Sequence, residues 1–356
     1  MMKKGFITHR NCIHAMLLFC ITWTMLSCSK DKDAPAPTTD PGYNSRIKFV
    51  LQDNFNFSVV NVCLMYAGLQ DSLAAPGPFT FLAPNNNSWG NLGVGINVTV
   101  NTFLFISSQR MRNMMRYHTL YGSFSFRGLP VGTDTAYTTV SGGHLYVKKF
   151  VNVKDTVVTV NGVKVESLDN PASNGMVQGL TAVLNPEIYP TIAGFVHNEP
   201  NLTMFSAALQ RSGLDTALLS GNDVYTVLAP SNKAFINSAG KFPGIDISSI
   251  DAILHAAPDK LAAILKYHMI KGRFYQGDLY RVTATAPGKS MIMLNNGKVA
   301  VNGNASAYNA ISFLGRGNQG NAARIYTPAE YNPGFDYASI TCGNGVLYET
   351  DAVLIP

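Results

Sequence analysis

The chain has 356 residues, of which 46% are hydrophobic and 13% charged, and its formal net charge is +6. This balance is typical of globular domains with sizeable apolar cores, and it excludes extended disorder beyond the N-terminal region. Removing three basic leader residues, Lys3, Lys4 and Arg10, lowers the charge from +6 to +3, so we expect no nucleic-acid partner.

The first 27 residues have the layout of a secretory signal. The basic residues are followed by an apolar run that ends at Leu26, and Ser27 precedes Cys28. The segment from Met25 to Cys28 is similar to a bacterial lipobox, although Met25 and Leu26 replace the usual leucine and small residue. The alternatives are cleaved soluble export and a retained membrane helix, for which the apolar run is short.

We therefore expect a signal peptide over residues 1–27, lipidation of Cys28, and a Pro/Thr-rich flexible tether over residues 28–44. The membrane would then be reached through the N-terminal lipid. The expected location is the outer membrane, with the protein exposed at the cell surface, as in exported lipoproteins of the Bacteroidetes type.

Beyond the tether, the chain repeats itself. Residues 79–89 and 225–235 share an apolar strand, an Ala-Pro stop and a polar helix start. A period near 150 residues is too long for a solenoid unit, so each copy should be a self-contained domain. We place the first domain at residues 45–188 and the second at residues 189–356.

The elements of the first copy follow from local patterns. Apolar residues at helical spacing predict a helix with Asn56 as its N-cap, and a strand that ends at Pro84 comes next. A helix from about Thr102 to Met115 should follow, and the turn Asn161-Gly162 between alternating segments predicts a hairpin. Helices lead and strands follow, which indicates the α+β class.

The copies differ between the hairpin and the closing strand. If Val301-Asn302-Gly303 corresponds to Val160-Asn161-Gly162, the distance to the closing glycine is 13 residues in the first copy and 42 in the second. We therefore expect an insertion at about residues 304–341, either packed on its own domain or binding a ligand. Its aromatic side chains are candidate ligand contacts: Tyr308, Phe313, Tyr326, Tyr331, Phe335 and Tyr337.

Four motifs recur in the same order in both copies: the Ala-Pro strand end, a Tyr-His pair before a glycine, a Val-Asn-Gly segment and a closing Asn-Gly segment. Together they resemble the fasciclin domain family over residues 45–356. The resemblance implies tandem β-sandwich or wedge domains with helices packed at one side. It also implies a secreted or anchored protein of adhesion or of the matrix.

In animal members of that family, the Tyr-His region is associated with adhesion. By resemblance, the candidate partner contacts are Tyr117, His118, Tyr267 and His268. The alternative is that these histidines are structural residues at a junction between helix and strand.

The sequence shows no zinc-binding spacing and no nucleophile elbow, and Cys63 and Cys342 read as buried free thiols. We therefore expect no enzyme activity, no metal and no cofactor. The leading hypothesis is a surface lipoprotein that mediates adhesion or binds a protein partner. The alternative is a glycan-capturing lipoprotein that assists an outer-membrane importer.

Overall fold

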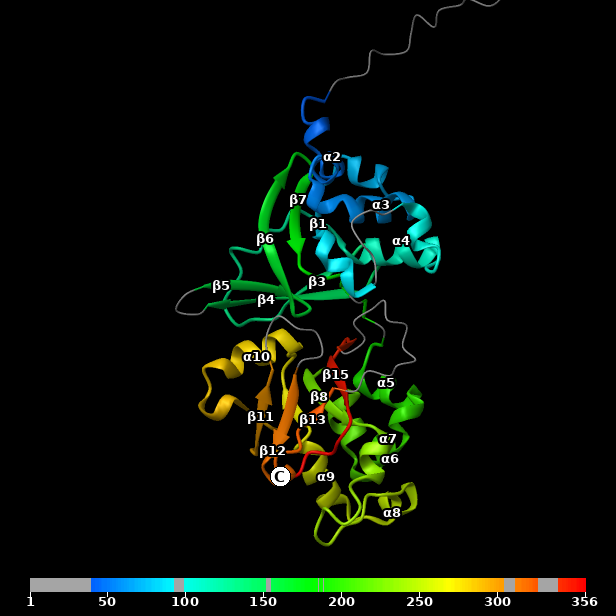
Figure 1. Cartoon of the computed structure of the whole chain (residues 1–356), viewed down its shortest axis with the longest axis vertical. Coiled ribbons are helices and arrows are strands. Elements are labelled where there is room, and N and C mark those ends of the chain that lie inside the picture. Colours follow the sequence, from blue (N-terminus) through cyan, green and yellow to red (C-terminus); the bar gives the residue numbers. More distant parts are fainter. Residues whose placement is uncertain are drawn as a thin grey trace, which may run out of the picture. The chain divides into compact units, whose positions relative to one another are not determined.

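The computed structural model describes residues 40–92, 99–151, 155–184, 186–187, 189–303, 311–325 and 339–356 (Figure 1). The leader and Cys28 lie outside these ranges. Residues 44–356 form one compact unit. Within the described ranges, no helix has the length and apolar character needed to cross a membrane.

The first half consists of helices followed by strands. Its elements are α2 (Ile47–Gln52), α3 (Ser58–Tyr66), β1 (Phe79–Pro84), α4 (Ser108–Tyr117), β2 (Thr119–Tyr121), β3 (Thr135–Thr138), β4 (His144–Val151), β5 (Thr156–Val160), β6 (Val163–Ala172) and β7 (Gly175–Leu180). Short helical turns join them: η1 (Tyr43–Ser45), η2 (Phe55–Phe57), η3 (Asp71–Ala74), η4 (Asn86–Leu92) and η5 (Val100–Phe103).

The second half repeats this order with additional helices. Its elements are α5 (Ile192–Asn198), α6 (Thr203–Ser212), β8 (Tyr225–Pro230), α7 (Asn232–Ile236), α8 (Ile250–His255), α9 (Pro258–Lys266), β9 (Met269–Lys271), α10 (Gln276–Ala284), β10 (Ser290–Ile292), β11 (Lys298–Asn302), β12 (Ser312–Gly315), β13 (Ala323–Arg324), β14 (Ile340–Cys342) and β15 (Gly345–Thr350). Its short turns are η6 (Pro200–Leu202), η7 (Asp215–Leu219), η8 (Pro287–Lys289) and η9 (Arg316–Asn318).

The strands of the first half form one bent sheet in the order β2-β1-β7-β6-β5-β4-β3. The long strand β6 belongs to both arms of the sheet, and its pairing with β7 shifts register between Val165 and Ser167 and again between Ser167 and Asn170. Such irregularities bend a strand. They allow β6 to pass from one layer of the sandwich to the other.

The second half has the same two layers as separate sheets, β10-β11-β12-β13 and β14-β15-β8-β9. In each half the first long strand pairs in parallel with the last one, β1 with β7 and β8 with β15. The remaining ladders are antiparallel. Mixed pairing and segregated helices place both halves in the expected α+β class.

Each half has two apolar cores, one on each face of its central strands. On β1, Phe81 and Ala83 pack with α2, α3 and α4, whereas Leu82 faces the core between the sheets. This alternation follows from the two-residue period of a strand. Figure 1 shows α3 and α4 beside β1 and β7. The second half divides Val227 and Leu228 between two cores in the same way.

Two local expectations for the first half need correction. The helix expected from Thr102 to Met115 is two elements, because Ser107 caps a new helix by accepting a hydrogen bond from the Arg110 amide at 3.2 Å. Asn56 is not an N-cap. Asn54 accepts the Asn56 amide at 3.0 Å and begins η2 instead. The hairpin turn at Asn161-Gly162 is confirmed, with φ of 47° and 76°.

The expected equivalence of the two Val-Asn-Gly segments is wrong. The Tyr117 hydroxyl donates to the His144 carbonyl at the start of β4, and the Tyr267 hydroxyl donates to the Lys298 carbonyl at the start of β11. Strand β11 is therefore the counterpart of β4 and not of β5. Its end at Gly303 does not correspond to the hairpin at Gly162.

This register also corrects the expected insertion at residues 304–341. Strands β12 and β13 extend the sheet of β10 and β11, so they are the counterparts of β5 and the start of β6. The additional residues of the second half lie after Phe313 and between Ile325 and Ile340, and not in one block. The match of the two Val-Asn-Gly segments was misleading, because cross-strand pairing, and not a three-residue identity, sets the register of a strand.

Candidate functional site

The four Tyr-His side chains lie at the junction of a helix with a short strand and are buried. Tyr117 and Tyr267 are each 1% exposed, and His118 and His268 are 0% and 1% exposed. In both halves the pair lies at the C-terminal end of the helix, α4 or α9, and precedes the edge strand, β2 or β9. The expected role as direct partner contacts does not fit this geometry, because none of these side chains reaches the surface.

Both histidines link two backbone segments, the helix before them and the closing segment of their half. The His118 Nδ1 is 2.9 Å from the Met114 carbonyl, and its Nε2 accepts the Leu184 amide at 3.0 Å. These partners require a neutral ring with the proton on Nδ1. Burial lowers the pKa of His118 to about 4, and the hydrogen bond to the Met114 carbonyl raises it only in part.

His268 repeats the arrangement. Its Nδ1 lies 2.9 Å from the Ile264 carbonyl, its Nε2 accepts the Leu354 amide at 2.8 Å, and burial lowers its pKa to about 4. Each neutral histidine therefore ties the helix before it to the closing segment of its own half. These contacts fit the alternative interpretation, in which both histidines are structural residues at a junction between helix and strand.

The Ala-Pro motif has a similar structural role. Asn86 accepts the Val59 amide at 3.1 Å and donates to the Phe55 carbonyl at 2.7 Å, so it caps α3 from a distant loop. Asn232 accepts the Met204 amide at 2.9 Å and donates to the Pro200 carbonyl at 3.0 Å. Each side-chain amide therefore holds the second helix of its half, α3 or α6, to the segment that follows β1 or β8.

The closing Asn-Gly motif joins the two ends of each half. Asn174 accepts the Ile47 amide at 2.8 Å and donates to the carbonyls of Leu73 and Ala75 at 2.9 and 2.7 Å. The sequence marked this position as repeated, but only the structure shows its three partners.

Asn344 makes the same set of bonds. It accepts the Ile192 amide at 2.7 Å and donates to the carbonyls of Leu219 and Gly221 at 2.8 and 3.1 Å. The repeated polar side chains thus position the backbone of each half.

The aromatic side chains of the expected insertion do not form a described site. Phe313 lies on β12 with 0% exposure and packs in the core of the second half, near Tyr348. It is therefore a packing residue and not a ligand contact. The other candidates lie outside the described residues: Tyr308, Tyr326, Tyr331, Phe335 and Tyr337.

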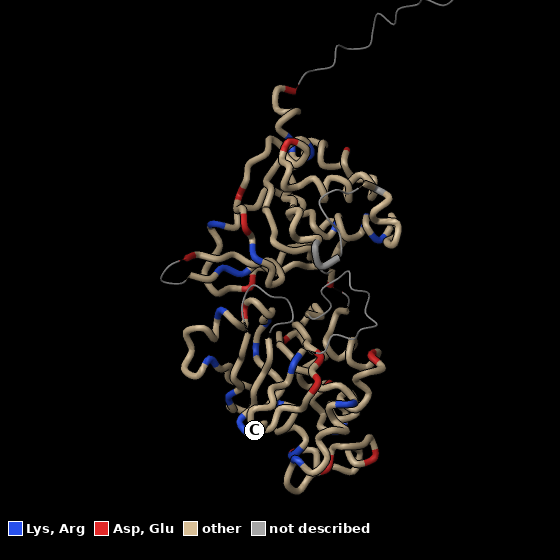
Figure 2. Tube along the Cα trace, in the orientation of Figure 1, with Lys and Arg blue, Asp and Glu red and all other residues tan. Residues whose placement is uncertain are grey.

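Buried charges gather where side chains of the first half contact those of the second. Charged residues are otherwise thinly spread over the trace (Figure 2). Lys148 lies 3.3 Å from an Asp134 oxygen and donates to the Arg273 carbonyl at 2.7 Å. The Arg273 guanidinium stacks 3.5 Å from the centre of the Tyr146 ring. Sequence patterns gave no signal for this cluster, because its members come from distant segments.

Arg273 is 2% exposed and bonds to one turn of backbone. Its guanidinium donates to the carbonyls of Cys342, Gly343 and Gly345 at 2.8, 2.7 and 2.5 Å. Nearby, burial raises the pKa of Asp278 to about 6, although the charges of Lys148 and Arg281 act against the rise.

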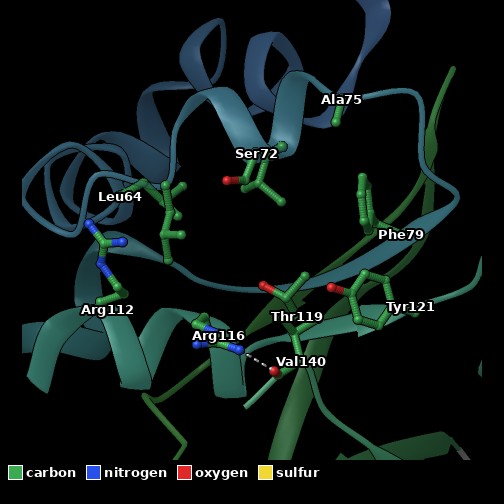
Figure 3. Close-up of a pocket in the computed structure, with 11 residues that line it drawn as sticks. Leu64, Ser72, Ala75, Phe79, Arg112, Arg116, Thr119, Tyr121 and Val140 are labelled. Atoms are coloured by element: carbon green, nitrogen blue, oxygen red, sulfur yellow. Dashed lines mark hydrogen bonds between the residues drawn. The ribbon is translucent and has the colours of Figure 1, made fainter. Parts of the chain in front are cut away.

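A cavity of about 410 Å³ lies in the first half between α3, η3, α4 and the edge of the β1–β2 ladder (Figure 3). Arg112 and Arg116, one turn apart on α4, extend toward it, and the Arg116 Nη2 donates to the Val140 carbonyl at 2.9 Å. The lining contains no carboxylate. Its residues are Leu64, Leu69, Ser72, Leu73, Ala75, Phe79, Arg112, Arg116, Thr119, Tyr121 and Val140.

In the described part of the chain, no group of three or more His, Cys, Asp or Glu residues could hold a metal ion. The two thiols described, those of Cys63 and Cys342, are unpaired and buried. Burial raises the pKa of both, that of Cys342 to about 12, so they remain protonated.

The fold can now be compared with known proteins. The chain is 28% identical over 206 residues to transforming growth factor-beta-induced protein ig-h3 of Sus scrofa, and the alignment covers 57% of this chain and 27% of that protein. It is 28% identical over 211 residues to periostin of Homo sapiens, with 57% and 22% covered. It is 30% identical over 138 residues to Protein sll1483 of Synechocystis, with 38% and 71% covered.

The chain thus spans less than a third of the length of these two animal relatives. Among solved structures, the FAS1 domain pair from the insect cell adhesion molecule fasciclin I aligns with a TM-score of 0.39 and 18% identity, over 85% of this chain and 98% of that chain. A family model described as the fasciclin domain matches residues 55–186 and 200–356, one match in each half. With both halves matched, the chain belongs to the fasciclin domain family and contains two fasciclin domains in tandem.

Proposed function

We propose that this protein is a non-enzymatic cell-surface lipoprotein that mediates adhesion or binds a protein partner through its two fasciclin domains. The observation that carries the proposal is the match of both halves to the fasciclin domain. Members of this family are mainly proteins of adhesion and of the matrix. Binding would come from surface complementarity and not from a reaction.

The hydrogen bonds of the repeated motifs support a binding role. His118, His268, Asn174 and Asn344 are buried and bonded to backbone groups. The residues that the two halves share therefore maintain the fold. Among the described residues, no polar cleft is common to both halves. Partner contacts would come from exposed side chains, such as Phe55 and Leu104, which are 71% and 69% exposed.

An adhesion assay tests the proposal. Cells that display the full chain should bind other cells or matrix-coated surfaces more strongly than cells without it. Replacing the exposed Leu104 by serine should weaken that adhesion if the first domain carries the contact, whereas Lys233→Ser in the second domain serves as a control. Adhesion equal to that of cells without the protein contradicts the proposal.

The anchor is a separate part of the proposal. Residues 1–27 would be removed, Cys28 would carry the lipid, and residues 28–44 would hold the domains away from the outer membrane. Labelling of cells with a palmitate analogue should mark the wild-type chain and not the Cys28→Ser variant. Equal labelling of both chains would exclude Cys28 as the lipidation site.

The competing role is glycan capture beside an outer-membrane importer, with the aromatic residues between Ile325 and Ile340 as the binding segment. A glycan array probed with the full chain, and with a chain trimmed of residues 326–338, which leaves β12 and β13 intact, separates the two roles. Selective sugar binding that is lost on trimming would favour capture. Adhesion to cells or proteins without selective sugar binding would favour the leading proposal.

A further inference from the structure

The cavity of the first half has a counterpart in the second half that is filled. The pairing of Phe81 with Thr119 in one half, and of Val227 with Met269 in the other, makes Thr119 and Met269 equivalent. Thr119 is a cavity-lining residue, whereas the longer Met269 is 0% exposed and packs in the core. A smaller, polar side chain therefore stands where the second half has an apolar one.

The opposite wall of the cavity also carries a smaller, more polar side chain than the second half has at the same place. Because Asn174 bonds to the Leu73 carbonyl and Asn344 bonds to the Leu219 carbonyl, the preceding residues Ser72 and Leu218 are equivalent. Leu218 packs against the core of the second half, and Ser72 lines the cavity. Two substitutions on separate segments thus leave open in the first half a space that side chains occupy in the second.

The helix beside the cavity differs in charge. The histidine bonds to Met114 and Ile264 align α4 with α9, so Arg112 corresponds to Ala262, which packs against the core. Arg112 is exposed and makes no hydrogen bond or ion pair with any residue of the described ranges. Gly68 allows its close approach, since a Cβ there would lie 2.9 Å from the Arg112 Nη2.

We propose that this cavity binds a small amphipathic carboxylate. The apolar body would lie against Leu64, Leu73 and Phe79, and the carboxylate would pair with Arg112. Arg116 adds a second cation one helical turn away, although one of its nitrogens already donates to the Val140 carbonyl.

Size and charge both favour this class of ligand. At about 410 Å³ the cavity falls in the lower part of the range for small-molecule pockets, roughly 300 to 1,000 Å³. A guanidinium without a partner in the described part of the chain, beside apolar walls, favours an anion with an apolar body over a sugar or a free phosphate, which would leave those walls uncovered. The site is independent of the proposed adhesive role, so either can fail without the other.

The test measures octanoate binding to the full chain in lipid nanodiscs, with empty discs as the blank. Octanoate should bind saturably by calorimetry and by ligand-observed NMR. Octanamide, which has the same apolar body without the charge, should bind about tenfold more weakly. Absence of saturable octanoate binding, or equal binding of octanamide, overturns the proposal.

Three variants locate the site. Arg112→Ala should weaken octanoate binding about tenfold, whereas Arg110→Ala, which removes the same charge from the same helix outside the cavity lining, should leave it unchanged. The double variant Ser72→Leu with Thr119→Met fills the cavity with the side chains that the second half already accommodates, so it should fold and lose binding. Octanoate binding that persists in both the Arg112→Ala and the filled variant would place the ligand elsewhere and refute the assignment.

Discussion

The two halves of the molecule have the same hydrogen-bonded joints, which are the buried contacts of His118 and Asn174 in the first half and of His268 and Asn344 in the second. They differ in how the chain crosses between the two layers. In the first half, β6 runs through both layers as one strand with two register shifts. In the second half the same path is divided into β13 and β14, with Ile325 still paired to Thr350 as Val165 is to Leu180. The comparison teaches that the joints define this fold, while continuity of the crossing strand is not required.

The halves also differ at Arg273, which follows Gly272 as Ser123 follows Gly122 in the first half. Arg273→Met should lower the free energy of unfolding by about 3 to 5 kcal/mol, because three backbone carbonyls lose a buried cationic donor. Chemical denaturation of the variant measures this loss. Arg316→Met, at an exposed position of the second half, is the matched control and should change stability by less than about 0.5 kcal/mol. A loss of less than about 0.5 kcal/mol in both variants would show that Arg273 does not stabilise the fold.

The shared joints can be tested one half at a time. Asn174→Ala and Asn344→Ala should each cost about 3 kcal/mol, because each leaves one backbone amide and two carbonyls without their buried partner. Thermal and denaturant unfolding measure both values. Asn198→Ala, an exposed helix position, is the control. Costs that differ severalfold between the halves would break the equivalence of the two joints.

The buried histidines predict a matching pH dependence. Their folded-state pKa of about 4 lies below the ordinary 6.5, so below about pH 6.5 the unfolded chain binds the proton more readily. Their contribution is complete above about pH 6.5 and is lost as the pH falls toward 4, by about 3 kcal/mol per histidine. The stability gap between the wild type and His118→Gln, or His268→Gln, should narrow by that amount from pH 7 to pH 4.

The comparison with variants is necessary because two carboxyl groups act in the opposite direction. Burial raises the pKa of Asp278 to about 6 and that of Glu349 to about 7, so their contributions favour lower pH. Both groups are present in every variant and cancel in the difference. His255→Gln, at an exposed histidine, is the control variant measured over the same pH range. A constant gap for His118→Gln would mean that burial does not lower the pKa of His118, which would contradict the prediction.

The smallest effect concerns the open and the filled cavity. Met269→Thr removes core volume from the second half and should cost about 2 kcal/mol, whereas Thr119→Met in the first half should change stability by less than about 1 kcal/mol, because open space receives the side chain. The denaturant midpoints of the two variants, compared at equal m-values, measure the difference between their stability changes. Equal and large losses in both variants would mean that the first half has no space at this position.

Local signals in the sequence predicted the features that depend on neighbours in the chain. The turn at Asn161-Gly162 formed as expected because two residues with positive φ suit a tight hairpin. Ser231 caps α7 by accepting the Ala234 amide at 3.2 Å, at the polar helix start that the repeat predicted. The α+β class followed from the order of these segments.

Features that depend on distant segments were not predictable. The second Val-Asn-Gly segment was misaligned because only the bond from Tyr267 to the Lys298 carbonyl reveals its strand's register. The cavity exists because Ser72 and Thr119, from separate elements, are both small. The burial of His118 also depends on the closing segment, whose Leu184 amide it accepts. In each case the deciding contact joins residues far apart in the chain.

The parallel pairing of β1 with β7 and of β8 with β15 has a consequence for biosynthesis. In both halves the last strand to be made is an interior strand, with a neighbour on each side. A nascent half therefore lacks the middle of its sheet until its final residues leave the ribosome, and such non-local pairing forms slowly. A prematurely terminated chain would expose the apolar faces of its helices, which makes incomplete copies ready substrates for proteolysis.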